Sequence, residues 1–398
     1  MTGFLKQHLI DPELCIRCYT CEEICAINAI SHDDNNVVVD MSKCQYCMDC
    51  IAPCPTGSID NWRIVTKPYS IEEQYEWLEL PEQEEQEEGS GGKGELIEAL
   101  DEDVAALLAQ AHLGAGGKAM APLSASKPTV NLHSFDKPVE ALVQGTYRLT
   151  QEGGDGEVHH IILDLGADAF PVLEGQSIGI IAPGTAKNGK PHLPRLYSIS
   201  SPRDGERPNT NNLSLAIKRH EHGLCSNYMC GLQRGDKVNV TGPFGASFLL
   251  PEDPRAKLIM ICTGTGSAPF RGFTMRRQRT MPDLMGGLKL FFGAQSPETL
   301  PYFQPLKKIP DAFLEKHFAY SRLDNEPKEY VQDKLRAAAS QLAPMLKDPD
   351  TYIYICGLKA MEEGVEHAFE DIAQNAGMNW KDIRDQMREA GRYHVETY

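Results

Sequence analysis

The chain lacks any uninterrupted apolar run of about 18 residues, the length that spans a bilayer. Its first residues, MTGFLKQHLIDPEL, contain neither the basic start nor the apolar stretch of an export signal. Basic residues are also in the minority, 39 against 56 acidic ones, and the net charge is −17. These absences argue against a membrane protein, an exported protein and a nucleic-acid-binding protein, and we expect a soluble cytoplasmic protein.

The excess of negative charge lies in one region. Residues 1–103 hold 23 acidic and 6 basic residues, whereas the rest of the chain holds 33 of each. An acidic N-terminal third suits a domain that docks on basic protein surfaces. A solvated acidic face without a partner explains the charge of the linker equally well.

The chain of 398 residues exceeds what one hydrophobic core usually organises, so several domains are expected. Residues 1–70 are rich in cysteine, and residues 71–128 read as an acidic flexible linker with a short helix at about 95–112. Short segments rich in Val, Ile, Leu and Tyr predict an antiparallel β-barrel over 129–252. Apolar strands alternating with helical stretches predict an α/β doubly wound parallel sheet over 253–398.

Eight of the twelve cysteines form two runs of C-x2-C-x2-C-x3-C, and a proline follows the second run. This is the spacing of bacterial two-cluster ferredoxins, in which the fourth cysteine of each run ligates the other cluster. Two zinc sites are the alternative, but they would leave four of the eight cysteines in excess. We therefore predict a ferredoxin-like α+β domain with two [4Fe–4S] clusters. The predicted ligands are Cys15, Cys18, Cys21 and Cys54 for one cluster, and Cys44, Cys47, Cys50 and Cys25 for the other.

Three further motifs suit the phosphates and rings of nucleotide cofactors. The sequence RLYS at 195–198 ends a predicted strand, where an arginine can pair with a pyrophosphate and a tyrosine can stack on a ring. Small residues in GLCSNY at 223–228 open a helix and present backbone N–H groups to a phosphate. The sequence CTGTGSAPF at 262–270 follows an apolar strand, as a dinucleotide loop does, although a simple glycine turn would explain it in isolation.

In this order the motifs resemble the plant-type ferredoxin–NADP reductase family across residues 129–398, together with CGLKAMEEG at 356–364 and the terminal VETY. The resemblance implies an NADPH-dependent oxidoreductase that binds FAD. The residues it places at FAD are Arg195, Leu196, Tyr197, Ser198, Ala216, Ile217, Lys218, Gly223, Leu224, Cys225, Ser226, Thr265 and Tyr398. Gly266, Gly357 and Leu358 complete the predicted cofactor-binding turns.

The same resemblance implies roles for the residues nearest the flavin and the nicotinamide. Tyr197 would lie on one flavin face, Ser198 near its N5, and Tyr398 on the other face, from which it must yield to nicotinamide. Cys356 and Glu396 would position nicotinamide C4 against flavin N5, so the predicted catalytic set is Ser198, Cys356, Glu396 and Tyr398.

A separate group of residues resembles the pocket that holds the adenosine 2′-phosphate. Its members are Ser321, Arg322, Lys328, Tyr330 and Gln332. A guanidinium and hydroxyls suit a dianionic phosphate, so NADPH is favoured over NADH. Solvated loop charges are the alternative interpretation of Arg322 and Lys328.

A two-cluster ferredoxin domain followed by this reductase module resembles the reductase components of di-iron oxygenase systems in aerobic aromatic breakdown. The implied route runs from NADPH to FAD, to the two clusters and to a di-iron oxygenase partner. The chain has no Glu-x-x-His motif on paired helices, which agrees with oxygen chemistry on another protein. A general NADPH-dependent reductase of ferredoxin or flavodoxin, or a redox-sensing subunit, remain alternatives. No G-x-S-x-G motif supports a hydrolase.

Overall fold

The chain forms two compact units in the computed structural model. The first comprises Met1–Ala99 with the loops Asp164–Phe170 and Asp204–Asn212, and the second comprises the rest. The described residues are 5–47, 49–51, 53–59, 61–81, 120–151, 156–186, 189–323 and 325–398. The predicted linker helix at 95–112 lies outside them. Within these ranges no helix is long and apolar enough to cross a membrane.

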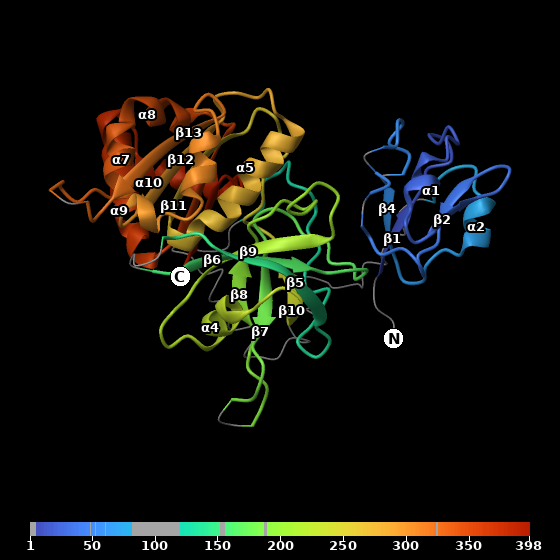
Figure 1. The fold of residues 1–398 in the computed structure, drawn as a ribbon. Helices are drawn as coiled ribbons and strands as arrows, with labels where there is room; N and C mark the ends of the chain where they lie inside the picture. The colour runs from blue at the N-terminus through green and yellow to red at the C-terminus, as the bar shows by residue number, and fades with distance from the viewer. Residues whose placement is uncertain are drawn as a thin grey trace. The chain divides into compact units, whose positions relative to one another are not determined.

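The Cys-rich part of the first unit consists of two small antiparallel sheets and two short helices (Figure 1). Strand β1 pairs with β4, and β2 pairs with β3. The bounds are β1 Leu5–Leu9, α1 Thr20–Ile24, β2 Ile30–His32, β3 Val37–Val39, β4 Asn61–Val65 and α2 Ile71–Tyr75. Helix α2 begins at a capping box in which Ser70 Oγ accepts from the backbone N–H of Glu73 and the Glu73 carboxylate accepts from that of Ser70.

The core of this part is small and includes two of the cysteines. Its buried members are Ile10, Cys21, Ile30, Val37, Val39, Cys50 and Ile59. Arg17 and Tyr46 each precede the second cysteine of their run and adopt left-handed φ angles of 54° and 56°. Because few non-glycine residues adopt this conformation, the sequence repeat is also a repeat of backbone structure.

A six-stranded sheet in the order β8-β7-β10-β5-β6-β9 forms the first half of the second unit. The bounds are β5 Val139–Arg148, β6 Val158–Asp164, β7 Ser177–Ile181, β8 Arg195–Ser198, β9 Asn212–Lys218 and β10 Lys237–Phe244. The pairs β7–β8, β7–β10 and β5–β10 are antiparallel. A bridge between Ile199 and Leu215 joins the residue after β8 to β9, the two edge strands. The closed barrel and the domain boundaries stay predictions.

A five-stranded parallel sheet in the order β13-β12-β11-β14-β15 forms the second half of this unit. The strand bounds are β11 Lys257–Thr263, β12 Leu288–Ala294, β13 Leu314–Tyr320, β14 Thr351–Gly357 and β15 Tyr393–Thr397. The helices among the described residues of this unit are α4 Leu224–Gly231, η1 Gly264–Ser267, α5 Ala268–Thr280, η2 Pro297–Thr299, α6 Phe303–Lys308, α7 Val331–Ala337, α8 Ala339–Lys347, α9 Lys359–Asn375 and α10 Trp380–Glu389.

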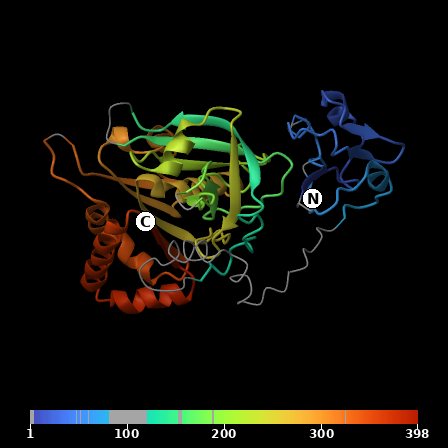
Figure 2. The ribbon, with the colours of Figure 1, turned by 90° about the horizontal axis from the view of Figure 1, so that it is seen from below.

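Alternation along the strands explains why helices cover both faces of the parallel sheet. Ile259 and Ile261 of β11 pack with residues of α7 to α10, whereas Met260 and Cys262 pack with residues of α5 and α6. Figure 2 shows the red C-terminal helices grouped on one side of the sheet. The predicted doubly wound parallel sheet is confirmed.

Candidate redox cofactor sites

The first cysteine set surrounds the buried thiol of Cys21. Burial, together with the neighbouring thiols of Cys15 and Cys54, raises the pKa of Cys21 to about 11. Cys18, whose side chain is exposed, lies close enough to Cys54 for their charges to interact. The four thiols predicted to bind one cluster are therefore electrostatic neighbours, although Cys54 comes from the other sequence run.

The second set surrounds Cys50 in the same way. Burial raises the pKa of Cys50 to about 12, and Cys44 and Cys47 add to the shift. Burial also raises the pKa of Cys44, with further contributions from Cys47 and Cys25. Cys25 is the fourth cysteine of the first run. It lies with the thiols of the second run, just as Cys54 lies with those of the first.

Hydrogen bonds to sulfur suit thiolate ligands in both sets. The backbone N–H of Ala29 donates to Cys25 Sγ at 3.2 Å, and Ser58 Oγ lies 3.4 Å from Cys54 Sγ. Burial opposes ionisation of Cys54, but hydrogen bonds led by that of Ser58 outweigh it and lower its pKa to about 7. Within the described residues no group of His, Cys, Asp or Glu side chains could hold a single metal ion. The donor chemistry fits cluster ligation, and the assignment of ligands stays a prediction.

The RLYS strand and helix α4 meet although they are distant in sequence. Strand β8 pairs with β7, so Ile180 lies opposite Arg195. The Tyr197 hydroxyl and the Cys225 thiol are hydrogen-bonded, and burial raises the pKa of both groups. The Cys225 thiol also donates to the Ile180 carbonyl, with Sγ 3.8 Å from the oxygen. A guanidinium, a phenol ring and the start of α4 therefore converge, as a flavin nucleotide requires.

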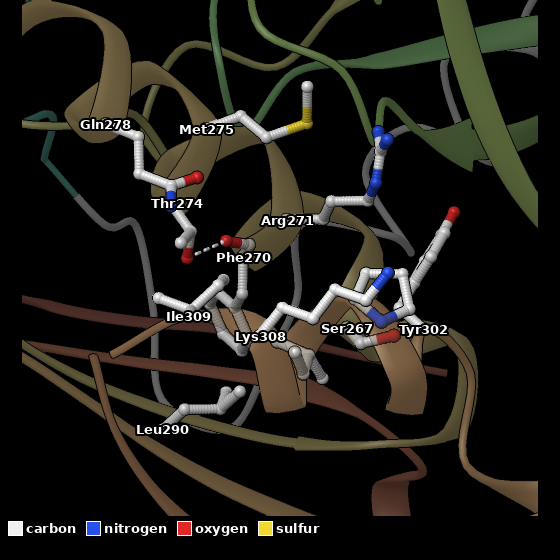
Figure 3. Close-up of a pocket in the computed structure, with 12 residues that line it drawn as sticks. Ser267, Phe270, Arg271, Thr274, Met275, Gln278, Leu290, Tyr302, Lys308 and Ile309 are labelled. Carbon is white, nitrogen blue, oxygen red and sulfur yellow. Dashed lines mark hydrogen bonds between the residues drawn. The ribbon is translucent and has the colours of Figure 1, made fainter. Parts of the chain in front are cut away.

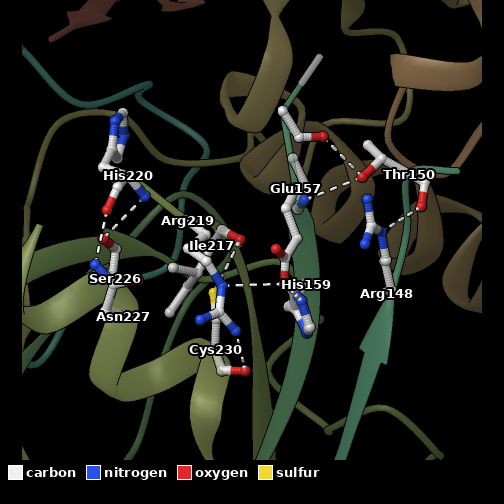
Figure 4. A network of polar contacts seen from close by, with 12 residues as sticks. Arg148, Thr150, Glu157, His159, Ile217, Arg219, His220, Ser226, Asn227 and Cys230 are labelled. Atoms are coloured by element: carbon white, nitrogen blue, oxygen red, sulfur yellow. Dashed lines mark hydrogen bonds and ion pairs between the residues drawn. The ribbon is translucent and has the colours of Figure 1, made fainter. Parts of the chain in front are cut away.

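A polar network fixes the loop between β9 and α4 (Figure 4). Arg219 Nε lies 3.0 Å from Glu157 Oε1, and its Nη2 donates to the Cys230 carbonyl at 2.8 Å. The same Glu157 oxygen lies 2.6 Å from His159 Nε2. These contacts join the end of β9, the start of β6 and the end of α4. At the other end of α4 the Asn227 side chain donates to the Gly223 carbonyl at 2.8 Å, and no side chain caps the helix.

Three ionisable side chains form a row at the carboxyl end of the parallel sheet. In the strand registers Cys262 lies beside Cys356, and Cys356 lies beside Glu396. Burial raises the pKa of Glu396 to about 8. Burial also raises the pKa of the Cys356 thiol, and the nearby Glu396 charge adds to this shift.

The C-terminal tyrosine lies at the same edge. Its hydroxyl is 2.6 Å from Thr265 Oγ1, and its backbone N–H donates to the Gly357 carbonyl at 2.9 Å. Its side chain is 62% exposed. The structure therefore brings together Thr265, Cys356, Glu396 and Tyr398, four residues that the sequence predicted to act in one site.

Two turns at this edge depend on glycine. A Cβ atom on Gly266 would lie 2.2 Å from the Cys356 carbonyl oxygen, so a side chain cannot be accommodated there without a shift of the backbone. Gly357 has a φ of +138°, which favours glycine. The Thr263 hydroxyl accepts from the Leu358 N–H at 3.2 Å and links the turns after β11 and β14.

The predicted 2′-phosphate residues lie next to the carboxyl ends of β12 and β13. The N–H groups of Ser321 and Arg322 donate to the carbonyls of Ala294 and Gln295 at 3.1 and 2.8 Å. The Glu329 N–H donates to the Tyr320 carbonyl at 3.0 Å, which returns the chain to β13. Arg322, Lys328 and Tyr330 are exposed, while Gln332 of α7 packs near Gly364 of α9. The group forms an accessible polar surface that fits a phosphate.

The sequence did not predict a polar network that lies just after the RLYS strand, β8. His160 Nδ1 lies 2.9 Å from the Tyr302 hydroxyl, which lies 3.5 Å from Ser200 Oγ. Arg271 stacks over the Tyr302 ring at 5.0 Å, and its Nη1 donates to the Ser200 carbonyl at 2.9 Å. The network therefore joins the two halves of the second unit two residues beyond Ser198. No local motif marks these residues, because they meet only through long-range packing.

Three protein-family models match separate parts of the chain. A 4Fe-4S dicluster domain matches residues 7–55, an oxidoreductase FAD-binding domain matches 155–248, and an oxidoreductase NAD-binding domain matches 260–367. The three matches follow one another in the order in which the motifs occur.

Individual relatives match over most of their own length. A ferredoxin–NADP reductase of Spirulina sp is 39% identical over 288 residues, which cover 68% of this chain and 98% of the relative. That of Thermosynechococcus vestitus is 38% identical over 331 residues, covering 77% and 85%. The solved ferredoxin–NADP+ reductase of Plasmodium falciparum superposes with a TM-score of 0.54 at 25% identity, covering 68% of this chain and 99% of that one.

Proposed function

The chain belongs to the ferredoxin–NADP reductase family, and from this premise we propose that it is the reductase component of a di-iron oxygenase system, benzoyl-CoA 2,3-epoxidase. It is an oxidoreductase of electron transport, and the predicted cofactors FAD, NADP and 4Fe-4S clusters are confirmed by the three matched domains. One observation carries the proposal. The chain holds two sets of four thiols and also the residues gathered at the carboxyl edge of the parallel sheet, Thr265, Cys356, Glu396 and Tyr398. A reductase with its own clusters can deliver electrons directly to an oxygenase.

The residues at the carboxyl edge would position the nicotinamide. Arg322 and Lys328 would bind the 2′-phosphate, leaving the nicotinamide end to reach the row of Cys356 and Glu396. The Tyr398 side chain is largely exposed and can leave the flavin face without opening the core. Thr265 would hold its hydroxyl when the nicotinamide is absent. Cys356 and Glu396 would then fix the distance and angle for hydride transfer.

When bound, the flavin and the clusters supply the conversion of a hydride into single electrons. The chain would bind these groups and would provide a surface at which electrons pass to the partner. Cys18 and Cys47, the second cysteines of the two runs, are exposed, whereas Cys21 and Cys50 are buried. Electrons would therefore leave near an exposed thiolate, toward a partner with a basic surface that complements the acidic N-terminal region.

A general ferredoxin or flavodoxin reductase is the second candidate, since the relatives are named ferredoxin–NADP reductases. The dicluster domain disfavours it, because an enzyme that carries its own clusters does not require a separate ferredoxin as its first acceptor. A redox-sensing subunit is disfavoured by the complete set of Cys356, Glu396 and Tyr398 at one edge.

The decisive experiment mixes FAD-loaded, cluster-replete protein with NADPH, O2, benzoyl-CoA and a purified di-iron oxygenase component, omitting each in turn. We expect an oxygenated CoA thioester, identified by mass spectrometry, only in the complete mixture. If a competent oxygenase forms no product while NADPH reduces added ferredoxin rapidly, the partner assignment is wrong and the second candidate is correct.

A further inference from the structure

A cavity of about 350 Å³ lies between α5 and α6, and none of its lining residues is among those predicted to hold FAD or NADPH, although Ser267 directly follows Gly266 (Figure 3). Phe270, Leu290 and Tyr302 are buried in its wall, and the exposed residues Gln278 and Lys308 lie at its mouth. All of these elements belong to the second unit. The cavity is therefore a separate feature of the reductase part.

The size and walls of the cavity suit a small aromatic molecule. An apolar protein cavity of about 150 Å³ accommodates benzene, and ligand pockets begin at about 300 Å³. The cavity thus has room for an aromatic ring with a short side chain. Two walls are the rings of Phe270 and Tyr302, and Met275 and Leu306 add adaptable apolar surface.

The polar groups of the cavity select the sign of the ligand's charge. None of the lining residues is acidic, whereas Arg271 and Lys308 are cationic. Lys308 forms no ion pair with any residue that the structure describes. The Ser267 and Thr274 hydroxyls donate to the carbonyls of Gly264 and Phe270, at 2.9 and 2.7 Å. A cation at the mouth and an apolar interior therefore fit an anionic head on an aromatic body.

We propose that this cavity is a binding site for a small aromatic carboxylate, with the ring between Phe270 and Tyr302 and the carboxylate at Lys308. The site is additional to the cofactor sites and goes beyond the proposed electron-transfer function. It does not depend on the identity of the electron acceptor.

The test uses the full-length, FAD-loaded protein and 3-phenylpropionate, titrated by isothermal calorimetry. Excess NADP+ is present throughout, so that the surface at Arg322 is filled and cannot bind the carboxylate. Two analogues of the same size vary only the head group: the neutral 3-phenylpropanamide and the cationic 3-phenylpropylamine. We expect one binding site, with the amide about five- to tenfold weaker than the carboxylate and the amine without measurable binding.

Variants locate the site. K308Q should weaken carboxylate binding about five- to tenfold without changing amide binding or NADPH–ferricyanide activity. K307Q is the matched control, because Lys307 lies over the Phe303 ring at 5.2 Å and does not line the cavity. M275W, which fills the cavity from its partly buried wall, should abolish binding of both compounds while the bound flavin keeps its visible spectrum. Carboxylate binding that is unaffected by K308Q and M275W, or an absence of binding to the unaltered protein, would overturn the proposal.

Discussion

Two regions of this molecule use cysteine in opposite ways. Between residues 15 and 54 eight cysteines stand in loops and the short helix α1 around a small core, and of these only Cys21 and Cys50 are buried. In the rest of the chain all four cysteines are buried, two of them in neighbouring strands of the parallel sheet. Left-handed residues at Arg17 and Tyr46 interrupt regular structure just before Cys18 and Cys47, whereas the other four cysteines lie in regular strands or in α4. The local backbone therefore distinguishes the eight predicted cluster ligands from the four cysteines in strands and helices.

The two regions also differ in what stabilises them. The Cys-rich region has few buried aliphatic residues, as expected of a domain too small for a self-sufficient core. The parallel sheet buries a full hydrophobic layer on each face. The first region should therefore depend on its metal clusters for folding, and the second should not.

The largest expected effect is the loss of folding in the Cys-rich region when a cluster ligand is removed. We expect Cys50→Ala to abolish reduction of the oxygenase and to expose the region to protease, because cluster binding and folding are linked. NADPH reduction of ferricyanide, which reaches the flavin without the clusters, should persist. The measurements are iron content, limited proteolysis and both activities.

Cys230→Ala is the matched control, since Cys230 is buried in α4 and is not a predicted ligand. Its cost should be limited to about 1–2 kcal/mol of unfolding free energy, with iron content unchanged. Full iron retention in Cys50→Ala, or equal damage in both variants, would remove the contrast between the regions.

The next effect separates two cysteines that lie side by side. Cys356→Ala should slow hydride transfer about 100-fold, because a shift of about 1 Å in the reacting groups can cost that much. Cys262→Ala, in register beside it, should instead lower stability by about 1–2 kcal/mol and leave the rate within about threefold. Stopped-flow reduction of the flavin by NADPH and thermal unfolding measure the two quantities. Equal slowing in both would show that neither thiol acts specifically.

Sequence reasoning was most successful where the chemistry is local. The four-cysteine runs carry their signal within a few residues, so the two [4Fe–4S] clusters followed from spacing, whereas FAD and NADPH were implied by the resemblance of the ordered motifs to a known family. The parallel sheet was equally accessible, because strands such as KLIMICT are continuously apolar and alternate with amphipathic helices.

Features that arise from long-range packing were inaccessible. The contact of His160 with Tyr302 joins residues 142 positions apart, and nothing near either residue marks it. The position of Cys262 beside Cys356 depends on strand register, which the order of strands along the chain does not specify, while the pairing of Cys356 with Glu396 was expected only from the family resemblance. The cavity beside α5 likewise exists only after α6 packs, so no sequence motif could have predicted it.

The next prediction concerns the surface predicted to bind the 2′-phosphate of NADPH, in the second unit. Arg322→Ala should raise the KM for NADPH about 30-fold, because a charge-assisted hydrogen bond to phosphate contributes about 2 kcal/mol. The KM for NADH is the internal control and should not change, since NADH has no 2′-phosphate. Steady-state ferricyanide reduction measures both. A parallel rise with NADH would mean that Arg322 holds a part common to the two nucleotides.

The smallest effect concerns the protonation of Glu396. Burial raises its pKa from 4.5 to about 8, so the folded protein carries it protonated at neutral pH. The proposed role is to position the nicotinamide through the neutral carboxyl, so flavin reduction should fall above pH 8, by about tenfold near pH 9. Glu396→Gln keeps a neutral amide and should remove this decline while the rate at pH 7 stays within about threefold.

Stability should follow the same proton with a defined sign. Between pH 4.5 and about 8 the folded state binds the proton of Glu396 more tightly than the unfolded state does. The contribution of this proton to the free energy of unfolding is complete below pH 4.5, falls as the pH rises toward 8, and no longer changes above pH 8. Urea unfolding of the wild type and Glu396→Gln, monitored by flavin fluorescence at several pH values between about 5 and 9, tests this difference. A decline in rate and stability that is identical in the variant would assign the titration to another group. The carboxyl edge would then resemble the Cys-rich region, because it would bind its cofactor without depending on the protonation state of Glu396.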